Sequence, residues 1–234
     1  MAAQENKSIL SPEIKEKFEG LYKKFVDSYL STPNSEQHKT LPIKSKQEAI
    51  ENFDQIKSAH KRGEDITDSV LKSFLPHRDT EYNRNRGAWI HIAPAINKDV
   101  KKWFENKGWI SKSDWPDVAK AIFRFVSKCI DNSGSLKSEC QTFLENPKIK
   151  GMQAGFLSPI LNALDPDHFI LVNSKPKDLI NYLAGTSFTA NLDDYPKINE
   201  VGIKIIDELK DVIAQANVPG LNSSSLLFAT SQII

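Results

Sequence analysis

Apolar residues recur at spacings of three and four along most of the chain, which is the period of an amphipathic helix. The first such run follows Ser11 and Pro12, an N-cap residue and a proline at the first helical position. Later runs also begin at polar capping residues and end at glycine or proline. We expect helices over residues 12–30, 45–63, 65–75, 97–108, 113–129, 135–146, 154–164, 174–185 and 194–216.

Two segments lack this period. Residues 76–96 indicate an ordered loop with one short strand at 88–92, and residues 169–172 are long enough only for a small strand or an extended link. The run 154–164 is apolar nearly all round, which predicts a central helix covered on both sides. The expected fold is mainly α, a multi-helix globular domain with at most one or two short strands.

The polar segment 31–42 contains two prolines and indicates a connector before a helix that starts at Ser45 and turns Ile50, Phe53 and Ile56 inward. We therefore divide the chain into an amino-terminal helix and connector (1–44), a helical domain (45–216) and a carboxyl-terminal segment (217–234). The last segment ends on uncharged apolar residues. It either docks on the helices or leads into a further domain.

Composition excludes several classes of protein. The 234 residues are 39% hydrophobic and 26% charged, which is typical of a globular protein rather than a disordered one. With 31 Lys and Arg against 30 Asp and Glu, the net charge of +1 excludes a uniformly basic nucleic-acid coat. No signal-peptide pattern and no apolar run of roughly 18 residues is present, so we expect a cytoplasmic protein without membrane contact.

Catalytic motifs are missing from the sequence. It contains no GxxxxGK[ST], GxGxxG, HExxH or GxSxG pattern, and its five histidines are scattered. Cys129 follows the period of its helix and is expected in the core. His77 and Asp79 are neighbours on a loop, which is commonplace and weak evidence for a catalytic pair. We expect no metal site, no cofactor and no enzymatic activity in this chain.

One segment departs from the rest in both charge and aromatic content. Residues 77–128 carry 11 Lys and Arg against 6 Asp and Glu, and all four tryptophans lie in this segment within a span of 27 residues. Positive charge beside aromatic rings binds phosphates and offers faces for base stacking. Trp103 and Trp115 follow apolar helical stripes and are expected in the core, whereas Trp89 is not committed to it.

The residues that we expect to contact DNA fall into three groups. Cationic side chains hold the backbone, Trp89 stacks on a base, and Asn83 or His91 bonds the edge of a base that is flipped out. Two residues at a helix start are secondary phosphate contacts. The full set is Arg78, Asn83, Arg84, Arg86, Trp89, His91, Lys98, Lys101, Asn173 and Lys175.

Two features of the sequence that favour DNA contact also have structural explanations. Arg84 and Arg86 can instead pair with acidic neighbours on the same loop and hold it in place. Gly151 and Gly155, ahead of an apolar helix, are similar to a helix-hairpin-helix turn that offers amides to phosphate. Glycines that let two helices approach closely explain the same spacing.

The runs LPHRDTEYNRNRGAWIHIAPAINKDVKKWFE (75–105) and KGMQAGFLSPILNALDPDHFILVNSKPKDLINYLAGTSF (150–188) resemble the region ahead of the motor in McrB-like AAA+ proteins of prokaryotic modification-dependent restriction systems. The resemblance covers about residues 60–216. It implies a helical module that recognises DNA, joined to a GTP- or ATP-driven hexameric ring that engages an McrC-like nuclease. Nucleotide hydrolysis does not carry over, because this chain lacks the Walker A motif.

From these observations we expect a DNA-recognition module of an McrB-like restriction or defence system, with modified bases among its candidate targets. Residues 45–216 are then the recognition domain, and residues 217–234 are a candidate linker to a motor domain outside this chain. The alternative is an assembly module that docks a motor or nuclease subunit without touching DNA.

Overall fold

The computed structural model describes residues 8–30, 35–74, 100–216, 223 and 227. Within these residues the chain forms α-helices and no strand, which confirms the mainly α prediction. None of the described helices is long and apolar enough to cross a membrane. The helices are α1 (Pro12–Phe25), α2 (Ser35–Lys61), α3 (Thr67–Ser73), α5 (Val100–Asn106), α6 (Trp115–Asp131), α7 (Leu136–Leu144), α8 (Ala154–Leu164), α9 (Ser174–Ala184) and α10 (Tyr195–Ala214).

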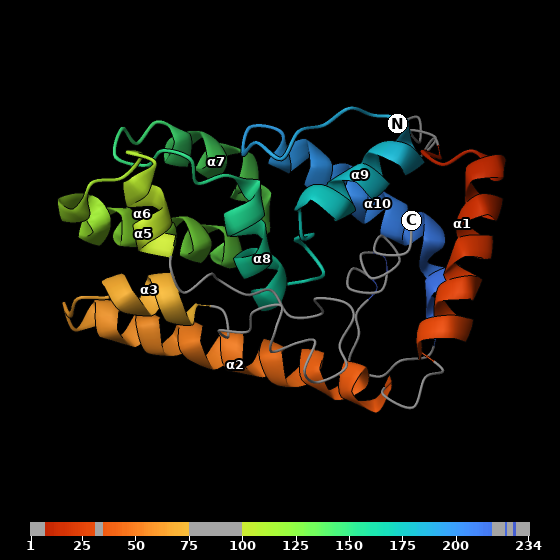
Figure 1. The fold of residues 1–234 in the computed structure, drawn as a ribbon, viewed down its shortest axis with the longest axis horizontal. Coiled ribbons are helices and arrows are strands. Elements are labelled where there is room, and N and C mark those ends of the chain that lie inside the picture. The colour runs from red at the N-terminus through yellow and green to blue at the C-terminus, as the bar shows by residue number, and fades with distance from the viewer. Residues whose placement is uncertain (1–7, 31–34, 75–99, 217–222, 224–226, 228–234) are drawn as a thin grey trace, which may run out of the picture.

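The long helix α2 lies along one edge of the molecule, and the short helix α3 lies beside it (Figure 1). α6 packs on α3, and α8 packs on both α2 and α6. At the other end of the molecule α10 contacts α9 and α1. One continuous apolar core joins these helices, so α8 has neighbours on more than one side, as its sequence predicts.

The amino-terminal helix forms as its pattern predicts. Ser11 caps α1, its Oγ accepting a hydrogen bond from Ile14 N at 3.2 Å. Phe18 and Tyr22 are buried, and the Tyr22 hydroxyl donates to the Ile213 carbonyl on α10 at 2.8 Å. A π-helical turn over Val26–Leu30 continues α1 to the predicted end.

The prediction for the second helix is wrong at its start. α2 begins at Ser35 and runs through Pro42, so the expected connector is largely helical, and the proposed division at residue 44 falls inside one helix. Ile50 is also wrongly placed, because its side chain is 40% exposed while Ala49 is fully buried. The buried face is centred on Ala49, Phe53 and Ile56, which recur at i, i+4 and i+7, and Ile50 lies about 100° away from Ala49 around the helix.

Residues 169–172 form an extended link and not a strand. Phe169, Ile170 and Val172 are fully buried, so the polar groups of their backbone need partners inside the protein. Helix α8 supplies some of them. The Ser158 hydroxyl accepts from Val172 N at 2.8 Å and donates to Val172 O at 3.2 Å, and the Asn162 amide donates to Phe169 O at 2.7 Å.

Helix α10 supplies two further partners from the other side. Asn199 Oδ1 accepts from Ile170 N at 2.8 Å, and the Tyr195 hydroxyl donates to Ile170 O at 3.1 Å. Gly202 gives Ile170 room, because a Cβ on this glycine would lie 2.3 Å from Ile170 Cδ1. The link is thus held between α8 and α10 by side chains that replace the partner strand of a sheet.

In the carboxyl-terminal segment the structure describes Ser223 and Leu227. Leu227 is fully buried and belongs to the apolar core. At this residue the segment packs on the chain's own helices, which was one of the two expectations for it.

Candidate nucleic-acid interface

Most of the predicted DNA contacts fall on a part of the chain about which the structure says nothing. The same part of the chain contains the expected strand at 88–92 and the candidate pair His77 and Asp79. Pairing of Arg84 and Arg86 with acidic neighbours also stays a prediction for this reason. The contact residues concerned are Arg78, Asn83, Arg84, Arg86, Trp89, His91 and Lys98, all outside the described residues.

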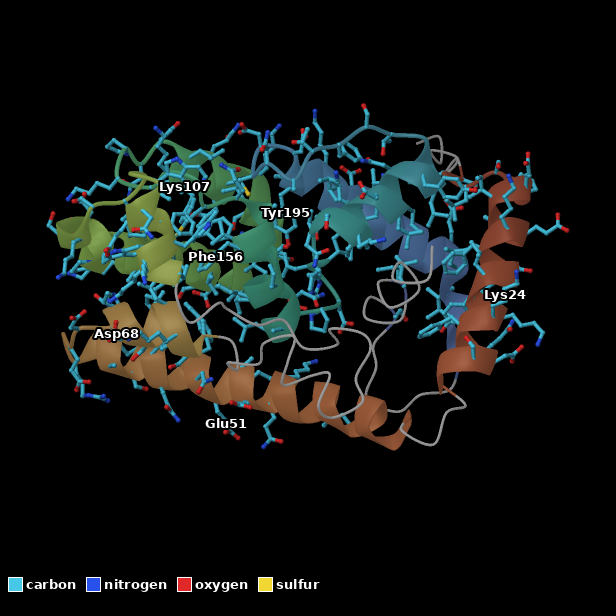
Figure 2. The ribbon with its side chains drawn as sticks, in the orientation of Figure 1. Lys24, Glu51, Asp68, Lys107, Phe156 and Tyr195 are labelled. Carbon is cyan, nitrogen blue, oxygen red and sulfur yellow. The ribbon has the colours of Figure 1, made fainter. Side chains whose placement is uncertain are left out.

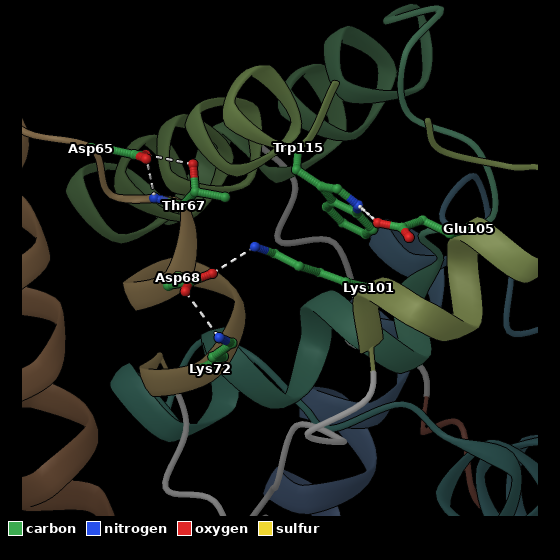
Figure 3. A network of polar contacts seen from close by, with 7 residues as sticks. All are labelled: Asp65, Thr67, Asp68, Lys72, Lys101, Glu105 and Trp115. Carbon is green, nitrogen blue, oxygen red and sulfur yellow. Dashed lines mark hydrogen bonds and ion pairs between the residues drawn. The ribbon is translucent and has the colours of Figure 1, made fainter. Parts of the chain in front are cut away.

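Lys101, on α5, is held by an internal ion pair. Its Nζ lies 2.6 Å from Asp68 Oδ1 on α3, and Lys72 Nζ lies 2.9 Å from the other carboxylate oxygen (Figure 3). Hydrogen bonds from Lys101 and then Lys72 lower the pKa of Asp68 below its ordinary value. The ammonium group of Lys101 therefore has an acidic partner within the protein, and its contact with a phosphate stays a prediction.

Asn173 and Lys175 lie at the start of α9 and are exposed. Asn173 is the N-cap residue, and its side chain makes no capping hydrogen bond. α9 and α5 lie well apart in the molecule, so these two residues do not belong to one site with Lys101 (Figure 1). Their role as phosphate contacts also stays a prediction.

Besides the Lys101 ion pair, other contacts among the described residues fix α5 against the body of the protein. Val100 and Phe104, one helical turn apart, are buried. Glu105, the single acidic residue of α5, has its Oε1 engaged by the indole N–H of Trp115 on α6 at 2.7 Å (Figure 3). The carboxylate of α5 is thus satisfied internally.

Trp103 is exposed, contrary to the expectation that it lies in the core. Its side chain is 48% exposed, whereas Trp115 is 2% exposed and does lie in the core as predicted. The reason is the position of Trp103 on the helix. The buried stripe of α5 passes through Val100 and Phe104, and Trp103 lies about 100° to one side of Phe104.

The exposed indole is nevertheless fixed in place. Its ring meets Phe104 edge-on at 4.9 Å between centroids, and it meets Trp109 edge-on at 5.3 Å. Trp109 in turn lies against Gly151, where a Cβ atom would fall 2.1 Å from the indole ring. Gly151 has φ +79°, so both its backbone conformation and its contact with Trp109 favour glycine. Close approach therefore accounts for this glycine, with the partner being a ring and not a second helix.

Exposed lysines lie close to Trp103 in the sequence. Lys102 and Lys107 are exposed, and Lys112 follows in the next turn (Figure 2 labels Lys107). Within the part of the chain that the structure describes, none of the three has an ion-pair partner. We call Lys102, Trp103, Asn106 and Lys107 the α5 surface. It combines an exposed aromatic ring with ammonium groups that have no ion-pair partner among the described residues.

The α5 surface lies inside the basic and aromatic segment of the sequence, but the sequence analysis does not predict its four residues as DNA contacts. The charge of the sequence identifies the basic segment, but it cannot show that Lys101 has an acidic partner and that Lys102 has none among the described residues. The helical spacing from Val100 to Phe104 is enough to place Trp103 beside the buried stripe. The apolar character of tryptophan nevertheless favours a core position, and this led to the wrong prediction.

Other candidate chemistry is weaker in the described residues. They contain no group of three or more His, Cys, Asp or Glu placed to hold a metal ion. Cys129 and Cys140 are buried, and burial raises the pKa of the Cys140 thiol to about 12, which disfavours a thiolate nucleophile. Cys129 lies in the core as predicted.

A cleft of about 560 Å³ lies between the start of α7 and the start of α10. Its lining carries Lys137 and Lys197 together with Asp193 and Glu200, so it has no dominant sign of charge. The polar groups of Asn199 at its edge are already bonded to the 168–170 backbone. The cleft therefore indicates no particular ligand, and the α5 surface is the better candidate.

No family model matches this chain, and no curated protein and no solved structure matches it either. The resemblance to McrB-like proteins stays a prediction from the sequence.

Proposed function

We propose that this chain is a DNA-recognition module, and that the α5 surface is part of the face that contacts DNA. One observation carries the proposal: Lys102 and Lys107 flank an exposed, fixed indole with no acidic partner among the described residues. The acidic residue nearest in sequence, Glu105, is bonded to Trp115 instead. Net positive charge is thus concentrated beside an exposed aromatic ring, in a chain whose net charge is only +1.

The chemistry of this surface suits a polyanion. Ammonium groups release the counterions condensed on a nucleic acid, and an indole offers a face on which a base can stack. The adjoining residues 77–99, with three arginines, extend the same basic segment along the chain. In this proposal they contribute further phosphate contacts and the pocket for a base.

The biological setting that we propose comes from the resemblance. The chain would supply DNA recognition, with modified bases as candidate targets, to an McrB-like restriction or defence system. A AAA+ motor and an McrC-like nuclease would be its partners and would perform the hydrolytic steps. The chain itself would bind and not catalyse.

The direct test is binding of labelled DNA duplexes by the whole chain, measured by fluorescence anisotropy over a series of salt concentrations. Unmodified, methylated and hydroxymethylated duplexes form the three arms. We expect the logarithm of the association constant to fall linearly with the logarithm of the salt concentration, because phosphate contacts release counterions. Affinity that does not respond to salt, or no binding of DNA in either duplex or single-stranded form, contradicts the proposal.

The variant that tests the α5 surface is Lys102→Ala with Lys107→Ala. Removing two phosphate contacts should reduce the magnitude of the salt slope by about 2 and weaken binding of all three duplexes alike. The matched control is Lys24→Ala with Lys61→Ala, which removes the same charge from exposed positions on α1 and α2. If both double variants weaken binding equally, the charge acts through the whole molecule and not through this surface.

A further inference from the structure

The α5 surface differs from a duplex-reading surface in what it exposes. Trp103 is an exposed aromatic residue, with nearly half of its surface accessible to solvent. In a duplex each base is covered above and below by its neighbours, and only base edges and the backbone are accessible. An indole face therefore finds a base to stack on only where nucleotides are unpaired or at the end of a helix.

The packing of Trp103 lowers the conformational entropy that its side chain would lose on stacking with a base. Its edge-to-face contacts with Phe104 and Trp109 hold the ring, and Phe104 is itself buried. Trp109 is held in turn against Gly151. A side chain that is already fixed loses little further freedom when a ligand binds, so more of the stacking energy appears as affinity.

The lysines are placed to follow a single backbone past this ring. Lys107 lies four residues after Trp103, and its amide donates to the Trp103 carbonyl at 3.2 Å, so the two residues are one helical turn apart on one face. Lys102 precedes Trp103 directly and is exposed on its other side. An α-helical segment of this length spans only about 10 Å, which matches a few nucleotides better than the two backbones of a groove.

We infer that the α5 surface binds single-stranded DNA, with one base stacked on Trp103 and the adjoining phosphates paired with Lys102 and Lys107. This inference rests on the proposed function, because it specifies the form of DNA that the same surface takes. Charge alone predicts the opposite preference, since a duplex carries more charge per unit length than a single strand. A preference for the single strand therefore reports the aromatic contact.

The experiment compares an oligothymidine of about 15 nucleotides with a duplex of the same length, at one salt concentration, by fluorescence anisotropy with the whole chain. We expect the single strand to bind more tightly. Trp103→Ala should lower affinity for the single strand by about tenfold and leave affinity for the duplex nearly unchanged. Trp103→Phe keeps a flat ring and should restore most of the lost affinity.

Tyr182→Ala is the matched control, because Tyr182 is an exposed aromatic residue on α9, 49% accessible, away from the α5 surface. It should leave both affinities unchanged. Circular dichroism of each variant shows whether the helices are kept, and the Trp103→Phe variant retains the packing on Phe104 if the alanine variant does not fold.

The outcomes separate this inference from the proposed function. Equal or weaker binding of the single strand, or a Trp103→Ala variant that weakens duplex and single strand alike, overturns the inference while salt-dependent binding keeps the proposed function. No salt-dependent binding of either form overturns both.

Discussion

Lys101 Nζ lies 2.6 Å from Asp68 Oδ1, and this ion pair joins α5 to α3 across 33 positions of sequence. The same carboxylate also pairs with Lys72. Lys101, which the sequence predicts as a phosphate contact, thus has an acidic partner within the protein. The neighbouring Lys102 has no such partner among the described residues. The arrangement separates the lysines that hold α5 in place from those that are free to contact a ligand.

The first prediction concerns this pair. Lys101→Ala should lower the free energy of unfolding by only about 0.2–1 kcal/mol, because Asp68 is largely exposed to solvent. The pKa of Asp68 is lowered in the folded state, so the contribution of the pair is complete above the unfolded pKa of about 3.9 and is lost as the pH falls through the folded pKa. Urea unfolding at neutral and acidic pH measures both effects.

The same pair also makes a prediction about binding. Asp68→Asn removes the anion that neutralises Lys101 and should tighten DNA binding, whereas Lys101→Ala should weaken it less than Lys102→Ala does. Anisotropy titrations of the three single variants compare these effects. A Lys101 variant that loses the most affinity would show that the ion pair opens when DNA binds.

The second prediction concerns Glu208 on α10, which holds the start of the described chain. Desolvation alone would raise its pKa, but hydrogen bonds from Ser8, Ile9, Lys15 and Leu10 lower the pKa to about 2. Glu208→Gln places an N–H group against these donors and should cost about 1–3 kcal/mol at neutral pH. The unfolded pKa is about 4.3, so this stability is complete above that pH and is lost as the pH falls toward 2.

Urea unfolding of wild type and Glu208→Gln, repeated from neutral pH to about pH 2, tests the assignment. The difference between them should shrink as the pH falls. Glu200→Gln is the control, because Glu200 makes an exposed pair with Lys204 on the same helix and should change stability by about 0.5 kcal/mol or less. Equal losses in the two variants would show that Glu208 has no special role.

The third prediction compares Gly151, ahead of α8, with Gly155 in its first turn. Gly151→Ala puts a Cβ 2.1 Å from the Trp109 ring at a residue with φ +79°, so it should destabilise the fold by more than about 1 kcal/mol. Gly155→Ala meets only the Val172 carbonyl at 3.9 Å and should be neutral or slightly stabilising. Thermal unfolding followed by circular dichroism distinguishes the two. Comparable losses would contradict the contact between Gly151 and Trp109.

The fourth prediction compares two serines whose hydroxyls are buried. Ser158→Ala leaves the buried Val172 N–H and carbonyl without their partner and should cost about 1–3 kcal/mol. The Ser127 hydroxyl has no hydrogen-bond partner among the described residues, so Ser127→Ala should change stability by less than about 0.5 kcal/mol. Urea unfolding of both variants provides the comparison. A neutral Ser158→Ala would mean that the link at 169–172 finds other partners.

How much of the fold follows from the sequence depends on how local the signal is. α8 begins and ends at the predicted residues, and α9 ends before Gly185, whose φ is +63°. Capping residues and stop signals act within a few positions, so the chain carries this information without its tertiary contacts. The same reasoning failed at Pro42, where a proline normally breaks a helix and α2 nevertheless continues.

The positions of the side chains at the α5 surface were harder to predict from the sequence than the helices were. The sequence by itself determined that the chain is mainly α, where most of the helices lie, and that positive charge and tryptophan coincide in one segment. Only the tertiary structure decided that Trp103 is exposed and that Asp68 neutralises Lys101. Helical period and capping are local properties, whereas exposure and ion pairing depend on which distant helix packs against a given face.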